Sequence, residues 1–386
     1  MYNPDDQEYA FSVKEFDNSP LNRVMKQAAP GEAWKPDGGH EVEFQYSTNT
    51  GSAEVYILTV TEDNELKKND YYDVGKLFKT ITIDENTGQS IEYKDISGRV
   101  VCTQVHEGSD WLRTYYAYDD FGLLRYVIPP KAYASLTQGG SYDTFDFDED
   151  WILSLCYYYE YDNRKRMKIK RLPGAYDIYA YDIYMVYNKR DQLVLTQDGK
   201  LRQEDADLWL FMKYDVFNRP VMTGIYDHET GVSQEAMQAE ANSDEYSLYE
   251  QFDLAFEHGY TNDAFPKIEN TNPEIQTLTY YDNYGCLGLE SYPADYAFQD
   301  SELNFDYLED NSYTTKTKGF VTAVNTKVLE HNGLTVEDDW LLSINYYDIY
   351  GRTVQVISDN HLGGIDIFSS NYNFTGELLQ SKENHD

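Results

Sequence analysis

The sequence predicts a mainly β protein that is built from tandem antiparallel β-hairpins. Two observations predict this fold class. Tyrosine accounts for 38 of the 386 residues, roughly three times its ordinary share, and a ring with a polar tip suits a strand whose face is only partly buried. A short motif, Tyr followed by Asp or Asn, also recurs along the chain at a spacing that is typical of hairpin turns.

The charge balance excludes two classes of partner. With 68 Asp and Glu against 31 Lys and Arg, the net charge is -37, which repels a phosphate backbone, so we expect no nucleic-acid ligand. No segment has the roughly 18 consecutive apolar residues of a transmembrane helix, so we expect no membrane insertion. The first residues, MYNPDDQEYAF, contain neither a basic nor an apolar stretch, so any export signal is expected to lie outside this chain.

The repeated unit is Tyr, then Asp or Asn, two variable residues and a residue that tolerates positive φ. Two copies are imperfect, because Tyr161-Asp162 is followed by Lys165 and because an extra residue separates Tyr93 from Asp95. The good copies are Tyr118-Asp119 with Gly122, Tyr187-Asn188 with Asp191, Tyr214-Asp215 with Asn218, Tyr281-Asp282 with Gly285, Tyr347-Asp348 with Gly351, and Tyr372-Asn373 with Gly376.

A hairpin turn explains this spacing. The Asp or Asn side-chain oxygen accepts hydrogen bonds from backbone N–H groups two residues on, as in an Asx-turn. The last residue then takes the left-handed conformation, and the resulting bulge matches the twist of the flanking strands. We therefore interpret the Asp and Asn as turn caps and the Tyr as packing residues. The arginines that follow the turns are expected to pair with nearby acids: Arg99, Arg166, Arg219 and Arg352.

The spacing of the motif also indicates one hairpin per period. The shortest steps between motif tyrosines are 25 to 27 residues. Residues 150–158, DWILSLCYY, resemble residues 339–347, DWLLSINYY, and both are predicted to begin a strand. Four of the five tryptophans come shortly before a motif tyrosine, and we interpret them as packing between neighbouring hairpins: Trp111, Trp151, Trp209 and Trp340.

Other segments lack the motif. Residues 40–46 and 53–60 alternate around STNTGS and predict another hairpin. A short helix is expected after Pro129-Pro130, and a longer one near Ser233 to Phe256. Residues 141–150 are expected to form an acidic loop. The sequence thus predicts an N-terminal hairpin region over residues 1–70 and a continuous repeat array over 71–386, with insertions near 129–150, 228–275 and 291–335.

The fullest copy of the motif runs from Tyr347 to Arg352, YDIYGR. It resembles the Y-D-x-x-G-R repeat of the bacterial Rhs and YD-repeat proteins and of their animal relatives, the teneurins. The good and degraded copies share one period, and the likeness covers the chain from about Tyr72 to the C-terminus. Three further segments look like parts of long Rhs chains: SPLNRVMKQAAPGEAW (19–34), RLPGA (171–175) and SDNHLGG (358–364).

This resemblance implies a curved or spiralling sheet that forms a hollow shell, often around a C-terminal toxin. It implies that the chain is a non-catalytic structural segment, an arc or partial shell, of a secreted or cell-surface polymorphic-toxin protein. Its partners would be the remaining repeats and the C-terminal effector of the parent chain. The sequence departs from the family because it lacks a DPxG-type core segment and any toxin after it, so the cargo is expected to lie outside this chain.

The residue patterns favour neither catalysis nor a cofactor. Carboxylate pairs are expected everywhere among 68 acids, so their spacing selects no glycosidase pair. The chain has no H-E-x-x-H, G-x-S-x-G or P-loop motif. Cys102, Cys156 and Cys286 form no C-x-x-C pair and are expected to be small packing residues beside strands. We therefore expect no enzyme activity, no catalytic residue and no cofactor.

The best metal candidate is a calcium site in the acidic loop, where alternating carboxylates could direct their oxygens to one side. The loop lacks the central Gly and terminal Glu of an EF-hand, and a solvated acidic face or a strand edge explains the same residues. The candidate ligands are Asp143, Asp146, Asp148 and Asp150.

Two alternative functions stay open. One is a cell-surface module that binds carbohydrate or protein, since exposed Tyr and Trp rings can stack on sugars while acids bind their hydroxyl groups. The other, an enzyme, has the least support. A segment of a sheet also leaves edge strands with unpaired backbone groups, so edge-to-edge self-association is expected of it.

Overall fold

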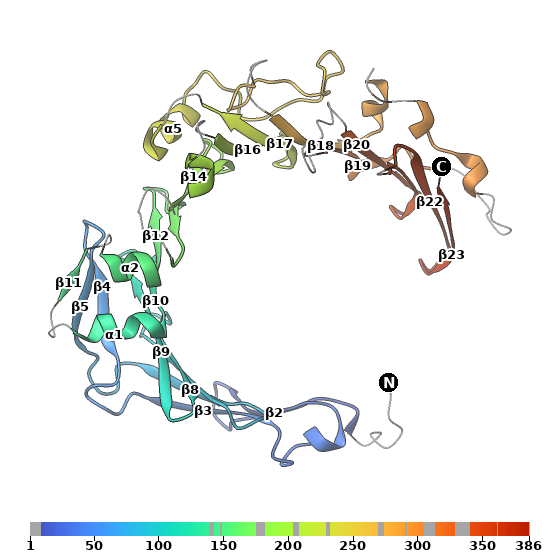
Figure 1. Cartoon of the computed structure of the whole chain (residues 1–386). Coiled ribbons are helices and arrows are strands. Elements are labelled where there is room, and N and C mark those ends of the chain that lie inside the picture. The colour runs from blue at the N-terminus through green and yellow to red at the C-terminus, as the bar shows by residue number, and fades with distance from the viewer. Residues whose placement is uncertain are drawn as a thin grey trace. The chain divides into compact units, whose positions relative to one another are not determined.

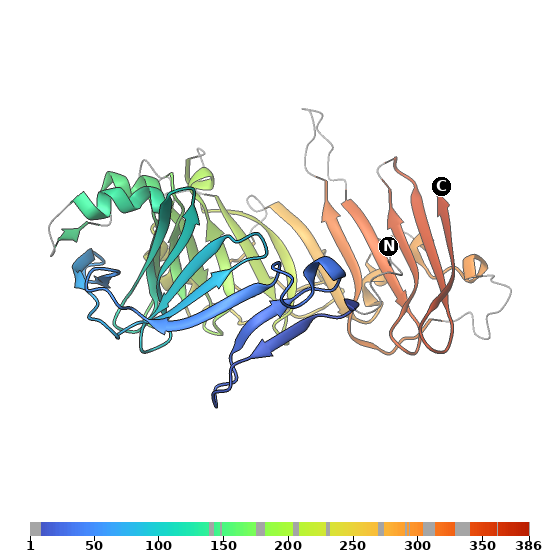
Figure 2. The same cartoon turned by 90° about the horizontal axis from the view of Figure 1, so that it is seen from below.

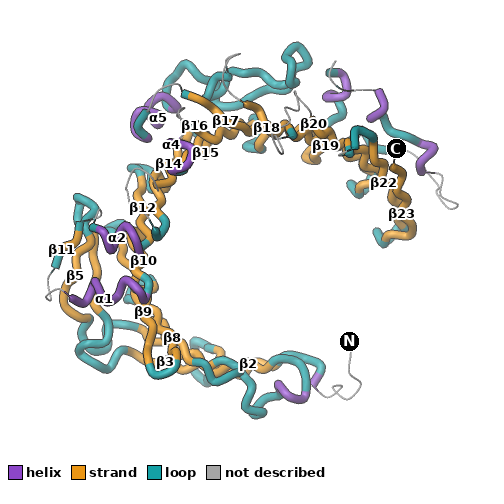
Figure 3. The backbone as a smooth tube through the Cα atoms, in the orientation of Figure 1, coloured by secondary structure: helices purple, strands orange, loops and turns teal. Residues whose placement is uncertain are grey.

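The computed structural model describes residues 9–138, 143–146, 149–174, 182–203, 208–228, 232–268, 274–289, 292, 294–303, 313–328, 340–360 and 362–385. The chain divides into two compact units, Met1–Ile183 and Tyr184–Asp386, here called the N-terminal and C-terminal units. Both consist mostly of antiparallel strands joined as tandem hairpins (Figure 1; Figure 3), which confirms the predicted fold class. The sequence alone did not predict the division into two units.

In the N-terminal unit, one row of antiparallel strands runs in the order β1, β2, β3, β6, β7, β8, β9, β10, β12 and β13. The hairpin of β4 and β5 pairs with the short strand β11 through β5, and β4 meets β9 of the row in one parallel bridge. The strands are β1 Val13–Phe16, β2 Val24–Ala28, β3 Val42–Thr48, β4 Tyr56–Val60, β5 Leu66–Tyr71, β6 Phe78–Ile83, β7 Gln89–Lys94, β8 Val100–Glu107, β9 Asp110–Tyr118, β10 Leu124–Ile128, β11 Thr144–Phe145, β12 Tyr157–Tyr161 and β13 Met167–Arg171.

The predicted hairpin between residues 40–46 and 53–60 is wrong, although both segments contain strands. Strand β3 pairs with β6, whereas β4 pairs with β5. The side chain of Asn49, directly after β3, donates to the carbonyl of Asp73 and accepts the N–H of Leu77, both at 2.9 Å. These bonds hold the end of β3 beside the start of β6. Pairing between segments so far apart in sequence leaves no local turn signal.

Two helices cover one side of the N-terminal unit's sheet (Figure 1). The helix expected after Pro129-Pro130 is α1, Pro130–Gln138, and it lies against α2, Asp150–Leu155, and against β9. The strand predicted to begin at Asp150 is wrong, because that segment forms α2. The similar segment in the C-terminal unit is a strand, β20, Trp340–Tyr347.

The surroundings of α2 explain why it is helical. Ile152 and Leu153 are buried together, and the Trp151 ring meets Phe145 edge-on while its Nε1 donates to Glu149 Oε2 at 2.7 Å. Nearly the same side chains thus form a helix or a strand according to the neighbours that cover them.

In the C-terminal unit, β14 to β23 succeed one another as antiparallel neighbours, and Figure 2 shows the last of them side by side. The strands are β14 Asp182–Tyr187, β15 Leu193–Gln197, β16 Leu208–Tyr214, β17 Pro220–Asp227, β18 Glu274–Asp282, β19 Thr317–Lys327, β20 Trp340–Tyr347, β21 Thr353–Asp359, β22 Ile365–Tyr372 and β23 Leu378–His385. The helices are α4 Gly199–Gln203, α5 Gln234–Ala241 and three short 3-10 helices, η3 Gly285–Gly288, η4 Ala294–Tyr296 and η5 Asp300–Leu303, while η2 Glu32–Trp34 lies in the N-terminal unit.

The long helix predicted from Ser233 to Phe256 is wrong beyond Ala241. Helix α5 begins where the Ser233 hydroxyl accepts the N–H of Ala236 at 3.2 Å, a regular N-cap. After Asn242 the chain continues without helix through residues 243–268, here called the crossing segment, which Figure 1 shows as a long loop beside β16 and β17. Its backbone is bonded to the sheet, since the Glu250 N–H donates to the carbonyl of Tyr214 at 2.8 Å.

The core of the C-terminal unit lies between the sheet and these covering segments. Along β16, Trp209, Phe211 and Lys213 are buried while Leu210 between them is 44% exposed, as expected for a strand with one covered face. The same hydrophobic cluster contains residues of α5 and of the crossing segment, among them Phe265. Within the ranges described above, no helix is long and apolar enough to span a membrane.

Candidate functional site

The repeated motif forms a regular turn at seven connections in the described part of the chain. In each turn the Asp or Asn side-chain Oδ1 accepts the backbone N–H groups two and four residues later. Asp348, for example, accepts from Tyr350 and Arg352, both at 2.9 Å. The seven turns are 95–99, 119–123, 162–166, 188–192, 215–219, 348–352 and 373–377.

The residue before the last position of each turn has positive φ. It is Gly in four turns and a larger residue in three, including Lys165 with φ 64°. The copy that looked degraded in the sequence thus has the same backbone as the others, although a side chain in this region is less favourable than Gly. The ladder shifts register beside the motif, for instance between Tyr346 and Tyr347, which is the expected bulge.

The motif tyrosines connect each hairpin to the one before it. In six motifs the Tyr hydroxyl donates to a backbone carbonyl in the second strand of the preceding hairpin, and in five of these six that carbonyl lies five residues after the preceding motif's Asp or Asn. The sequence indicated only packing for these rings, because the separation along the chain between a Tyr and its acceptor varies from 18 to 61 residues. The pairs are Tyr118 to Val100 at 2.8 Å, Tyr161 to Leu124 at 3.0 Å, Tyr214 to Leu193 at 2.8 Å, Tyr281 to Pro220 at 3.0 Å, Tyr347 to Val321 at 2.7 Å and Tyr372 to Thr353 at 3.1 Å.

Tyr187 makes a different connection. Its backbone N–H donates to Gln238 Oε1 at 3.0 Å, and its carbonyl accepts from Gln238 Nε2 at 2.6 Å. Because Gln238 belongs to α5, this motif holds the helix that covers the sheet.

The arginines after the turns connect successive motifs as well. The Nε of Arg99, Arg166, Arg219 and Arg352 donates to Oδ2 of the Asp in its own turn at 2.6 to 2.7 Å. Three of these guanidinium groups also lie over the next motif's tyrosine, a cation–π arrangement. The distances to the ring centroid are 5.1 Å for Arg99 and Tyr118, 4.2 Å for Arg219 and Tyr281, and 5.0 Å for Arg352 and Tyr372.

The bonds in one turn change the acidity of its carboxyl group. Burial by itself would raise the pKa of Asp162, but the backbone N–H and guanidinium of Arg166 stabilise the carboxylate more strongly, so the pKa is lowered. The charged form is therefore the one that caps the turn at neutral pH.

The predicted turn at Tyr281-Asp282 with Gly285 does not form. Asp282 itself has φ 71°, and Gly285 begins the 3-10 helix η3 with its N–H bonded to Asn283 Oδ1 at 2.7 Å. The physical reason is a long segment inserted between β18 and β19, because of which the chain does not reverse directly after Asp282 through the short turn of the other motifs. Strand β18 still pairs with β19, and Asp282 faces Thr317 at the end of that ladder.

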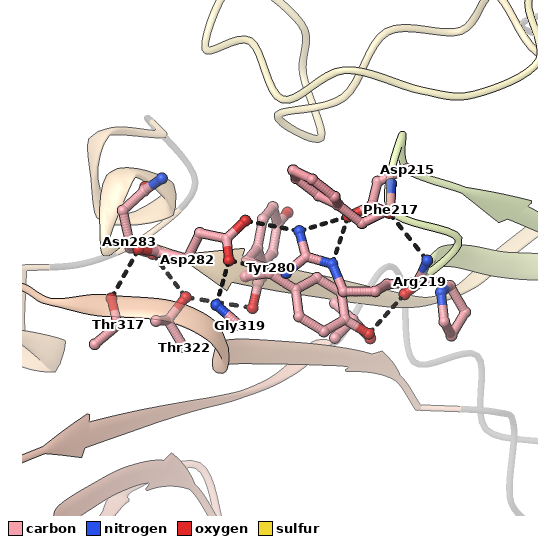
Figure 4. Close-up of polar contacts among 12 residues, drawn as sticks. Asp215, Phe217, Arg219, Tyr280, Asp282, Asn283, Thr317, Gly319 and Thr322 are labelled. Atoms are coloured by element: carbon pink, nitrogen blue, oxygen red, sulfur yellow. Dashed lines mark hydrogen bonds and ion pairs between the residues drawn. The ribbon is translucent and has the colours of Figure 1, made fainter. Parts of the chain in front are cut away.

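Asp282 instead forms the centre of a polar cluster (Figure 4). Its two oxygens accept both terminal nitrogens of Arg219 at 2.8 and 2.7 Å, and Oδ1 also accepts the Gly319 N–H at 2.6 Å. The Arg219 guanidinium holds the pKa of Asp282 below its ordinary value, and the two carboxylates raise the pKa of Arg219. One arginine therefore joins the motif acid Asp215 to an acid 67 residues later in the chain.

A cavity of about 340 Å³ lies beside this cluster. Aromatic rings and paired charges form its wall, and Arg219 engages both Asp215 and Asp282. The lining residues are Asp215, Val216, Phe217, Arg219, Tyr249, Glu250, Gln251, Phe252, Tyr260, Tyr281, Asp282 and Asn283.

The described calcium candidates have other contacts. The Asp143 carboxylate lies 3.5 Å from the buried Lys68 ammonium, the Asp146 backbone carbonyl accepts the Glu149 N–H at 3.2 Å, and Asp150 begins α2. Asp148 lies outside the described residues. Within the described ranges no three His, Cys, Asp or Glu side chains gather as metal ligands would.

The three cysteines are buried and free. Cys102 lies in β8, Cys156 directly after α2 and Cys286 in η3, and each is at most 1% exposed. Burial raises the pKa of Cys102 and of Cys286 to about 12, so these thiols stay protonated at neutral pH and are poor nucleophiles.

Two features were missed by the sequence reasoning. Asp84 and Asn360 cap hairpin turns in the same way, and Asp17 accepts the N–H groups two and six residues later, but no Tyr precedes any of them. The turn at Asn360 could have been found from its turn residues alone, because Gly363 stands three residues later. The other is a buried pair, Lys213 and Glu250, whose members lie 37 residues apart, and nothing in the local sequence signals it.

Comparisons with known proteins give one family match and several structural similarities. The sequence model of a family described as a domain of unknown function, DUF6443, matches residues 1–48. No curated protein matches the chain. The Photorhabdus luminescens Tc holotoxin pore with mutation TccC3-D651A is similar at 10% identity and a TM-score of 0.43, over 97% of this chain and 14% of that chain.

Two crystal structures are similar at the same level. For TcdB2-TccC3-Cdc42 the identity is 11% and the TM-score 0.40, over 96% of this chain and 16% of that chain. For TcdB2-TccC3 the identity is 10% and the TM-score 0.39, over 97% and 16%. This chain therefore spans less than a fifth of the length of the chains it resembles.

Proposed function

We propose that this chain is a non-catalytic structural segment of an Rhs-type YD-repeat shell, in a secreted protein that encloses or presents an effector. One observation carries the proposal: the motif residues are used in joining consecutive hairpins. The Asp or Asn caps its own turn, the Tyr bonds the hairpin before it, and the Arg contacts the Tyr of the next motif. Residues that recur once per hairpin and bond to one another suit an extended wall rather than a single active centre.

The acidic composition favours the same role. A wall with a net charge of -37 attracts a basic or unfolded chain. We infer that the partners of this segment are further repeats and the effector of the parent protein.

The experiment measures how well the parent protein protects its effector from a protease. In the full-length parent, replacing Asp215 and Asp348 by Ala removes two turn caps and is expected to increase the rate of effector cleavage. Replacing the same residues by Asn keeps Oδ1 as the cap, as Asn188 and Asn373 do naturally, and serves as the matched control. Equal cleavage rates in the wild type and the Ala variant would contradict containment.

The free edge of strand β23 allows a second test of the proposal. Strand β23 pairs with β22, and its other edge has no strand beside it in the described part of the chain. We infer that this edge pairs with another strand, either a further repeat or a second copy. Light scattering of the isolated chain should show a concentration-dependent dimer that disappears when Ser381, in the middle of β23, is changed to Pro; a monomer at all concentrations would contradict pairing between copies.

A second candidate function, surface binding, is favoured by the turn tips of the C-terminal unit. The variable positions of three motif turns expose large side chains: Phe217 is 61%, Ile349 74%, Tyr350 71% and Phe374 93% exposed. Contiguous apolar patches, unlike single exposed residues, mark binding surfaces, so this function requires the tips to act together on one ligand. Trp209 is fully buried, so it offers no face to a sugar, and the tips favour a protein ligand. Loss of cell binding in a variant with Ser at these four positions, with an unchanged unfolding temperature, would support this function.

A further inference from the structure

The buried face of β16 carries an amine among apolar side chains. Lys213 follows Trp209 and Phe211 at alternate positions, and its side chain is 0% exposed. The crossing segment covers it and supplies Glu250, whose side chain is also 0% exposed. A buried ion pair is weak as a source of stability, because removing both charges from water costs about as much as their attraction returns.

The amine touches a side-chain amide as well as the carboxylate. Lys213 Nζ lies 2.8 Å from Glu250 Oε1 and 2.7 Å from Asn262 Oδ1. The amide is held at both ends, because its Oδ1 accepts the Ile268 N–H at 3.0 Å and its Nδ2 donates to the Ile268 carbonyl at 2.6 Å. The amine thus contacts the oxygen bonded to Cγ of the fixed amide, and a small shift of Nζ from Oδ1 towards the face of the amide would bring it to the carbonyl carbon.

The carboxylate is also fixed in place. Glu250 Oε1 accepts the Ala264 N–H at 3.1 Å, and Oε2 accepts the Thr261 hydroxyl at 2.6 Å and the Asp263 N–H at 3.1 Å. A carboxylate that is immobile and in contact with the amine can take and return a proton without moving.

We propose that Lys213 and Asn262 form an intramolecular isopeptide bond, with Glu250 as the group that transfers the protons. The Lys213 ammonium first gives a proton to Glu250, and the neutral amine attacks Cγ of Asn262, forming the N–C bond. The Ile268 N–H stabilises the negative charge that develops on Oδ1. The protons of the amine pass through Glu250 to Nδ2, and the Cγ–Nδ2 bond breaks.

The reaction balances without any other reactant. One ammonium and one carboxamide become one secondary amide and one ammonium ion, and nothing is oxidised or reduced. Glu250 ends as the carboxylate that it was at the start. The product ties β16 to the crossing segment through a covalent bond between residues 213 and 262.

The surroundings favour the neutral amine that the attack needs. Burial lowers the pKa of Lys213, and Lys267 lowers it further, although the charges of Glu250 and Asp263 oppose this shift. The void beside Lys213 has a volume of about 10 Å³, at or below what one water molecule needs. The side chains of Lys213 and Glu250 are both 0% exposed, so the amine is shielded from bulk water.

The test is the intact mass of the purified chain. The wild type should be lighter than its sequence mass by one ammonia, and a protease digest should contain one branched peptide that joins Lys213 to Asn262. The Asn262→Asp variant should lose one water in the same reaction. Lys213→Arg and Glu250→Gln should keep their full sequence masses.

Matched controls distinguish the ammonia lost in forming this bond from ammonia lost in other reactions. Lys189→Arg removes a lysine whose ammonium pairs with the fully exposed Asp244, and it should keep the mass deficit and the branched peptide. A wild type of full sequence mass would overturn the proposal, as would a deficit that persists in Lys213→Arg. Because the wild-type digest decides the question, a variant that fails to fold leaves the test intact.

Discussion

Replacing Asp215 tests the role of the motif most directly. Asp215 accepts the N–H groups of Phe217 and Arg219 at 2.8 and 2.9 Å and the Nε of Arg219 at 2.6 Å. Loss of a side-chain cap costs about 1 to 2 kcal/mol, and loss of a charge-assisted hydrogen bond about 1.5 to 3 kcal/mol. Since Arg219 keeps Asp282 as a partner, we expect Asp215→Ala to lower the free energy of unfolding by about 3 kcal/mol.

The matched variant is Asp215→Asn, which keeps Oδ1 as the acceptor of both backbone N–H groups. It loses the charge and replaces Oδ2, which accepts the Arg219 Nε–H, by an NH2 group, so we expect a loss of about 1.5 kcal/mol. In a unit of this size 1 kcal/mol corresponds to about 2 to 4 °C in Tm, so Ala should lower Tm by about 6 to 12 °C and Asn by about 3 to 6 °C.

The assay is thermal unfolding followed by tryptophan fluorescence, because Trp209 is fully buried in the strand that precedes the turn. Asp244→Ala, at a fully exposed acid, controls for the loss of a negative charge and should leave Tm unchanged. Equal losses in the Ala and Asn variants would show that the ion pair rather than the turn cap stabilises the hairpin, and would refute the reasoning.

Three further predictions concern the same unit. Tyr214→Phe removes the hydroxyl that donates to the Leu193 carbonyl and should lower the free energy of unfolding by about 0.5 to 1.5 kcal/mol in urea unfolding; no change would mean that the ring alone joins the hairpins. Arg219 holds the pKa of Asp282 below its ordinary 3.8. The ionised Asp282 therefore stabilises the fold fully above pH 3.8, and this stabilisation is lost as the pH falls through the lowered pKa. In acid unfolding, the wild type should lose stability in this pH range and Asp282→Asn should not. Gly224→Ala places a methyl group 2.1 Å from a carbonyl oxygen of the facing strand, so we expect a loss of more than about 3 kcal/mol or an unfolded chain, seen by circular dichroism.

The features that could be predicted are those whose causes lie within a few residues. The turn at Asp348 depends on its own Oδ1, two nearby N–H groups and a Gly at φ 79°, all within five residues. Helix α1 follows its proline and α5 its serine cap for the same reason. The Tyr281-Asp282 turn failed because an inserted segment, and not the motif itself, decides how β18 is connected to β19.

The candidate sites were less predictable. Arg219 and Asp282 form an ion pair although they lie 63 residues apart in the sequence, and no spacing rule relates them. The sequence showed an excess of acids, which made every pair of carboxylates look equally plausible. Only the packed structure distinguishes an acid that caps a turn from one that bridges two motifs.

By itself the sequence determined most of the reversals that contain the motif and the residues that cap them, because a turn is stabilised by atoms close together along the backbone. The tertiary structure decided which strands pair, as for β3 with β6, and whether a D-W-x-L-S segment is the helix α2 or the strand β20. It also decided that Lys213 is buried against Glu250 and Asn262. The free energy of these arrangements comes from contacts between distant segments, which no short stretch of sequence contains.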